Sequence, residues 1–136
     1  MNESETLYTN LGKIQLLRSY SGLDTTVLNS KYNYFSIAAD KYFFINTSSG
    51  VLAGYITWAS INRDTYMQLK TTGNFPRYYH EWIEGNITLI LDVVIIPEWR
   101  KSLIKELLIF FKKHDKIVFV RQDTKVKRFN KQRVIL

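Results

Sequence analysis

The chain has 136 residues, enough for one domain with a buried core, and its 46% hydrophobic and 23% charged content is typical of a globular protein. It has no cysteine, which excludes disulfides, a thiolate nucleophile and cysteine-ligated metal. The acidic start is not followed by an apolar run, and no apolar run is long enough to cross a membrane. We therefore expect a cytoplasmic protein with neither a signal peptide nor a membrane span.

The net charge of +7 is unevenly distributed along the chain. Residues 1–98 carry seven Lys and Arg against nine Asp and Glu, a net of −2, whereas residues 99–136 carry twelve against three, a net of +9. The basic last third indicates an acidic partner, such as nucleic acid, anionic lipid or an acidic protein, or else a solvated basic surface.

The first segment, residues 4–20, is predicted to be an amphipathic helix. Its apolar stripe at helical spacing consists of Leu7, Leu11, Ile14, Leu17 and, at the margin, Leu16. Gly22 would end this helix, and Asp24 and Thr25 are candidate N-caps for the next segment. Residues 28–39 fit either a helix or a strand, and we expect a helix.

A β-hairpin is predicted next, because residues 41–47 and 51–59 are rich in aromatic and β-branched residues and flank a Ser-Ser-Gly turn. A short helix over 63–71 should end at Gly73, and an aromatic-rich connection follows over residues 74–85.

Residues 87–97 are apolar on both alternations, which predicts a buried central strand. Asp92 interrupts it, and a buried carboxylate needs partners. Two interpretations stay open from the strand alone: a carboxylate that bonds backbone where strands diverge, and a catalytic carboxylate at the centre of the sheet.

A helix over residues 97–114 is predicted to follow, with Pro97 in its first turn and basic residues at its end. Its core stripe would be Trp99, Leu103, Ile104, Leu107, Leu108 and Phe111. Residues 116–121 read as a strand, and 125–135 as a last basic strand or tail. The order of elements predicts one domain over residues 1–136, an α/β (α+β) fold with a mixed, mostly antiparallel central sheet and helices packed on it.

Common catalytic motifs are absent, including glycine-rich phosphate loops and the nucleophile elbow. His80 and His114 do not have metal-ligand spacing, so we expect no metal. We interpret His114 as a helix-end residue and His80 as a loop residue for which a catalytic role stays open.

One constellation of motifs resembles a known family. It consists of Leu11-Gly12, Ser21-Gly22-Leu23-Asp24, Asn33, Gly54-Tyr55-Ile56-Thr57-Trp58-Ala59, Glu81-Trp82, Leu91-Asp92 and Pro97. Over residues 11–123 this is similar to the toxin-activating lysine acyltransferases, which activate RTX protoxins such as hemolysin. The Tyr-x-x-Trp-Ala segment and its spacing to Asp92 are the most specific parts.

The resemblance implies a GNAT-like fold and the transfer of a fatty acyl group from acyl carrier protein to an internal lysine of a protoxin or secreted peptide. Family function rests on a His, an Asn and an Asp. Asp92 matches the Asp, Asn33 matches the Asn, and the family's His falls on Asp24. These three are the catalytic candidates, and the resemblance makes Tyr55 and Trp58 the candidates for substrate binding.

The donor is predicted from the turn after the central strand, where coenzyme A enzymes of this fold normally place glycines. Here the turn contains Pro97 and Glu98 and no glycine, so we expect no coenzyme A and no other cofactor. Acyl carrier protein is acidic, and the basic end is a suitable counter-surface. Its candidate contacts are Lys125, Lys127, Arg128 and Lys131.

Two other functions remain open from the sequence. One is a catalytically degenerate family member that binds toxin or acyl carrier protein without turnover. The other is a nucleic-acid-binding module that uses the basic end with Phe129, which is weaker because no nucleic-acid-binding motif occurs. A homodimer is also left open.

Overall fold

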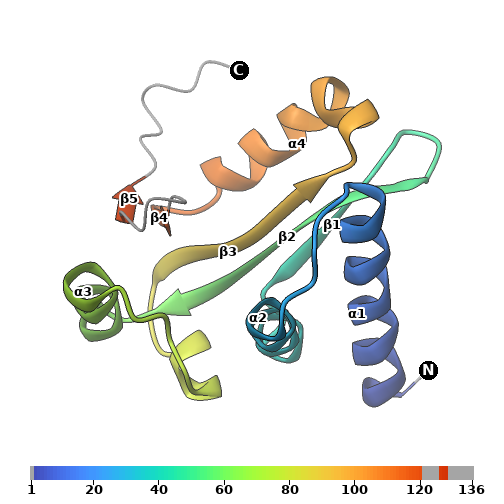
Figure 1. The fold of residues 1–136 in the computed structure, drawn as a ribbon. Helices are drawn as coiled ribbons and strands as arrows, with labels where there is room; N and C mark the ends of the chain where they lie inside the picture. Colours follow the sequence, from blue (N-terminus) through green and yellow to red (C-terminus); the bar gives the residue numbers. More distant parts are fainter. Residues whose placement is uncertain (1, 121–125, 129–136) are drawn as a thin grey trace.

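The computed structural model describes residues 2–120 and, for the backbone alone, 126–128 (Figure 1). Its elements in chain order are α1 (Glu3–Tyr20), α2 (Val27–Ala38), β1 (Tyr42–Asn46), β2 (Leu52–Ile61), α3 (Arg63–Thr72), η1 (Tyr79–Trp82), β3 (Ile87–Ile95), η2 (Pro97–Trp99), α4 (Arg100–Lys112), β4 (Lys116–Val120) and β5 (Val126–Arg128). The expected helix in residues 28–39 and the expected hairpin are both confirmed.

One five-stranded sheet organises the chain, with its strands in the order β1-β2-β3-β4-β5. The β1–β2, β2–β3 and β4–β5 pairs are antiparallel, and β3–β4 is parallel. Helix α4 makes the crossover that a parallel pair requires. The prediction of a mixed, mostly antiparallel sheet covered by helices is therefore confirmed.

Helices cover the two faces of the sheet unequally (Figure 1). On one face α1 and α2 pack against β2 and β3 through a cluster that contains Leu17, Tyr55 and Val94. On the other face α4 packs through Leu103, Leu107 and Phe110. A third cluster around Trp82 and Leu89 closes the end of the sheet near α3.

The helix boundaries follow local capping. Asn2 and Glu5 form a capping box at the start of α1, and Gly22, at φ +69°, follows its end. The predicted N-caps of α2, Asp24 and Thr25, are wrong, because the Thr26 hydroxyl accepts a hydrogen bond from the Asn29 amide at 3.0 Å. The predicted stop of α3 at Gly73 is confirmed, with φ at +74°.

The predicted helix over residues 97–114 divides into the turn η2 and the helix α4. Phe110, rather than Phe111, completes the buried stripe with Leu103 and Leu107, whereas Ile104 is 46% exposed. Leu16 of α1, at 49% exposure, likewise points away from the core. Both helices bury a narrower stripe than predicted, because each contacts only one face of the sheet.

Candidate functional site

The candidate site begins at an irregularity between β2 and β3. Thr57 pairs with Asp92, but the next residue, Trp58, pairs with Ile90, so Leu91 has no partner on β2. Such a bulge disturbs the strict alternation of side chains along a strand. Asp92 lies two residues before Val94 and points to the same face, the one covered by α1 and α2, where residues of both helices contact its carboxylate.

Three side chains donate hydrogen bonds to one oxygen of Asp92. The Arg18 Nη1 atom of α1 lies 2.7 Å from Asp92 Oδ2, and the Asn33 Nδ2 atom of α2 lies 3.1 Å from it. The Tyr55 hydroxyl of β2 donates to the same oxygen at 2.5 Å. No described residue donates to the other oxygen, Asp92 Oδ1, and the side chain is 15% exposed. Asp92 Oδ2 is therefore held by three donors, whereas Oδ1 has no donor among the described residues.

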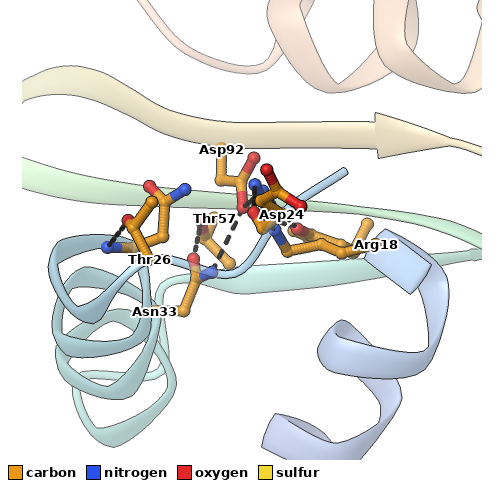
Figure 2. A network of polar contacts seen from close by, with 8 residues as sticks. Arg18, Asp24, Thr26, Asn33, Thr57 and Asp92 are labelled. Carbon is orange, nitrogen blue, oxygen red and sulfur yellow. Dashed lines mark hydrogen bonds and ion pairs between the residues drawn. The ribbon is translucent and has the colours of Figure 1, made fainter. Parts of the chain in front are cut away.

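A second set of contacts orients these donors (Figure 2). The buried Thr57 hydroxyl donates to Asn33 Oδ1 at 2.7 Å, which fixes the amide so that its nitrogen faces Asp92. Arg18 donates from Nη2 and Nε to the backbone carbonyl of Asp24, at 2.6 and 3.3 Å. The α1–α2 connection thus holds the guanidinium against Asp92.

The protonation states of the donors follow from their surroundings. Burial raises the pKa of Tyr55 well above its ordinary value near 10.0, the Asp92 carboxylate raises it further, and Arg18 only partly opposes this. Burial lowers the pKa of Arg18, but the hydrogen bond from Arg18 to Tyr55 and the charge of Asp92 outweigh burial and leave the pKa raised. Tyr55 therefore remains a neutral donor and Arg18 a cation at neutral pH.

Two features of the fold border this cluster. A cavity of about 530 Å³ between α1 and α2 has Arg18 and Asn33 among its lining residues. On the other edge of β3, pairing with β4 covers only residues 87–89 although β3 continues to Ile95 (Figure 1). The strands separate after Leu89 and Val118, and residues 90–93 are only half-buried in an otherwise buried strand. Within the described chain, the backbone groups of this edge have no strand partner.

The predicted site residues separate into two groups. Asn33 and Tyr55 each donate a hydrogen bond to Asp92. Asp24 joins the cluster through its backbone carbonyl, which accepts from Arg18 (Figure 2). The Asp24 side chain is exposed and makes no hydrogen bond or ion pair with another described residue. Trp58 lies elsewhere, on the α4 face, with its ring centroid 4.7 Å from that of Phe110. Among the described residues, Asp92 therefore supplies the one carboxylate in this hydrogen-bonded cluster, and the candidate Asp24 contributes its backbone carbonyl instead.

The remaining predicted residues lie away from this cluster or outside what can be described. Lys125 and Lys131 lie outside the described residues, and so do the side chains of Lys127 and Arg128 in β5. His114 follows α4, where its ring nitrogen is 3.0 Å from the Thr88 hydroxyl and its ring packs on Trp58. His80, in η1, is an exposed residue whose ring lies 4.0 Å from the Glu84 carboxylate.

Sequence reasoning missed Arg18 and Thr57. Arg18 lies four residues after Ile14, on the buried side of α1, and its side chain is only 8% exposed. A charged residue on the apolar side of a helix was the available signal, because such a residue needs a buried partner. Thr57 gave no comparable signal, since threonine is common in strands.

Comparisons with known proteins place the fold. No family model matches the chain, and no curated protein matches it. Among solved structures, the loading GNATL domain of CurA from Lyngbya majuscula matches with a TM-score of 0.51 at 18% identity. The match covers 82% of this chain and 60% of that one, so this chain spans less than two thirds of its neighbour. The fold is GNAT-like.

Among the described residues, no helix is both long and apolar enough to cross a membrane. In the same part of the chain, no three His, Cys, Asp or Glu side chains gather as metal ligands would.

Proposed function

We propose that this protein is an acyltransferase that moves a fatty acyl group from acyl carrier protein to a lysine amine of a protein or peptide. The observation that carries the proposal is the Asp92 carboxylate, bound through Oδ2 by three donors and open at Oδ1, beside the unpaired edge of β3. The GNAT-like fold and the resemblance to toxin-activating acyltransferases support the reaction class.

The reaction forms a C–N bond and breaks a C–S bond. A neutral lysine amine attacks the thioester carbonyl, and the carrier thiolate leaves and takes a proton from water. The lysine must first lose its ammonium proton to become neutral, because its ordinary pKa is near 10.4. The nitrogen then loses one further proton as the bond forms, because the amine has two hydrogens and the amide has one. Asp92 Oδ1 is the acceptor for that proton and passes it to solvent. Positioning of both substrates supplies much of the remaining rate.

Charge that develops on the thioester oxygen needs donors. Asn33 Nδ2 carries two hydrogens, and only one of them is directed to Asp92. Among the described residues, the backbone amides of β3 that face away from β2 beyond Leu89 have no strand partner. A thioester carbonyl beside this edge would receive hydrogen bonds from groups that are already fixed, which is the basis of oxyanion stabilisation.

The donor is carrier-bound rather than coenzyme A, for reasons at the end of β3. Pro97 removes an amide from the turn η2, and Glu98 places a negative charge where a pyrophosphate would approach. Arg100 and Lys101 begin α4 beside this turn and are exposed cations. These cations and the basic residues 125–131 suit an acidic carrier protein.

The test is intact-mass measurement of a target co-expressed with the protein, the target being the toxin or peptide encoded beside it. We expect a mass gain of one acyl group that resists hydroxylamine, as an amide does and an ester does not. Purified protein should transfer from acyl carrier protein and not from acyl-coenzyme A. Transfer from acyl-coenzyme A alone would contradict the donor assignment.

The same experiment distinguishes a binding protein from an enzyme. The absence of the family's His at Asp24 favours this alternative. A protein that binds acylated carrier protein in calorimetry but leaves every target mass unchanged would be a non-catalytic partner. Binding to DNA with a steep salt dependence and no binding to carrier protein would instead favour the nucleic-acid alternative.

A further inference from the structure

We propose that the cavity between α1 and α2 holds the aliphatic chain of the acyl group and that Gly12 sets the chain length it accepts. This inference rests on the proposed function. The cavity measures about 530 Å³, within the usual range of small-molecule sites. Its lining consists of Tyr8, Leu11, Gly12, Ile14, Gln15, Arg18, Thr25, Ser30, Lys31, Asn33 and Tyr34.

The charges of the lining residues favour an acyl chain over a lysine side chain as the occupant of the cavity. Only Arg18 and Lys31 are charged, and both are cations. Arg18 is already paired with Asp92, and the Lys31 ammonium lies 5.7 Å from the centre of the Phe35 ring. No carboxylate lines the cavity, so an incoming lysine would meet cations without a counter-charge. An uncharged aliphatic chain meets apolar walls from Leu11, Ile14 and Tyr34 instead.

Two lining residues connect the cavity to the Asp92 carboxylate. Arg18 and Asn33 both line the cavity and both donate to Asp92. An acyl chain lying between the helices would therefore bring its carbonyl carbon near the carboxylate that accepts the proton. The amine would then approach from the edge of β3 that, among the described residues, has no strand partner beyond Leu89.

Gly12 is the lining residue at which a larger side chain can reduce the cavity without disturbing the fold. It is exposed on α1, and a Cβ built there meets no atom within 4 Å. A larger side chain at this position would extend towards the cavity rather than into the packed core. Glycine within a helix is also destabilising by about 1 kcal/mol relative to alanine, so its replacement is not expected to unfold α1.

The experiment measures binding of octanoic, dodecanoic and hexadecanoic acids by calorimetry to wild type, Gly12→Leu and Gly12→Ala. Affinity of the wild type should rise about fourfold per added CH₂ until the cavity is full. Gly12→Leu should lose about tenfold or more for hexadecanoic acid and stay within about twofold for octanoic acid. Gly12→Ala adds a single methyl group and should give a smaller loss than Gly12→Leu. Leu16→Ala, which lies on the same helix outside the lining and is 49% exposed, is the control and should keep the wild-type profile.

A second readout uses transfer from the corresponding acyl carrier proteins. Gly12→Leu should shift the preferred donor to a shorter chain while leaving the KM for the acceptor unchanged. An unchanged chain-length profile would overturn the inference, and a raised acceptor KM with that unchanged profile would assign the cavity to the acceptor. If the wild type transfers no acyl group but Gly12→Leu still weakens binding of hexadecanoic acid, the proposed function fails and the cavity assignment stands.

Discussion

The two faces of the sheet use the same strands for different purposes. On the α4 face, Ile56 and Ile95 pack with the apolar stripe of α4, and this packing contributes mainly stability. On the α1–α2 face, the same strands carry the polar residues Thr57, which is buried, and Asp92, which is half-buried. Burial of polar groups is costly unless they find partners, and here Arg18 of α1, Asn33 of α2 and Tyr55 of β2 supply donors to Asp92. The α4 face is therefore apolar throughout its contact with the helix, whereas the α1–α2 face combines an apolar cluster with the polar cluster that we propose carries the chemistry.

The largest expected effect on the transfer rate is that of Asp92→Asn, on the α1–α2 face. An asparagine can still accept from Arg18, Asn33 and Tyr55 through its oxygen, but it cannot take a proton at the position of Oδ1. We expect the transfer rate to fall by about a hundredfold or more. The measurement is the rate of target acylation by mass spectrometry, with circular dichroism as the control for folding. Full activity of the folded variant would remove Asp92 from the mechanism.

Phe110→Ala tests the other face. Phe110 is 7% exposed and contacts Trp58 and His114, so its removal should lower the free energy of unfolding by about 3 kcal/mol or more. The rate constant for transfer, corrected for the folded fraction, should stay within about twofold of wild type. Urea unfolding and the corrected rate together check this. A large fall in the corrected rate with little change in stability would show that the faces are not separate.

Tyr55→Phe tests the hydroxyl that donates to Asp92 and accepts from Arg18. Because the pKa of Tyr55 is raised by burial and by Asp92, its contribution to stability is complete below the unfolded value near 10 and is lost as pH rises above that. The wild type should therefore lose stability steeply in alkali. The phenylalanine variant should start about 1 kcal/mol lower at neutral pH and show a weaker alkaline loss. Thermal unfolding between neutral pH and the most alkaline accessible pH measures both slopes, and parallel slopes would contradict the prediction.

The smallest effect should come from Asp24→Asn. Arg18 binds the backbone carbonyl of Asp24, which asparagine retains, and the side chain is exposed. We expect transfer within about threefold of wild type and stability within about 0.5 kcal/mol. Asp24→His is the informative partner, since it restores the residue that the resembled family has at this position. A loss of transfer in Asp24→Asn as large as that in Asp92→Asn would instead support a pair of carboxylates.

Much of the fold could be predicted because the signals are local. Helical spacing in α1 and α4, the aromatic and β-branched hairpin and the capping and stop residues act over a few neighbours. The apolar run of β3 identified the central strand, and Asp92 stood out in it because a carboxylate there has to be explained. Asn33 and Tyr55 came from the resemblance, and the structure brings both into contact with Asp92.

The sequence by itself determined the elements, the central strand and the position of the carboxylate. Only the tertiary structure decided which side chains surround that carboxylate. Arg18 and Asp92 are 74 residues apart in the chain, and no local pattern links them. Alternation along β3 puts Asp92 on the same face as Val94, and the packing of α1 over that face brings Arg18 to it. The same geometry places Trp58, three residues from Tyr55, on the opposite face, because side chains an odd number of residues apart on a strand point to opposite sides.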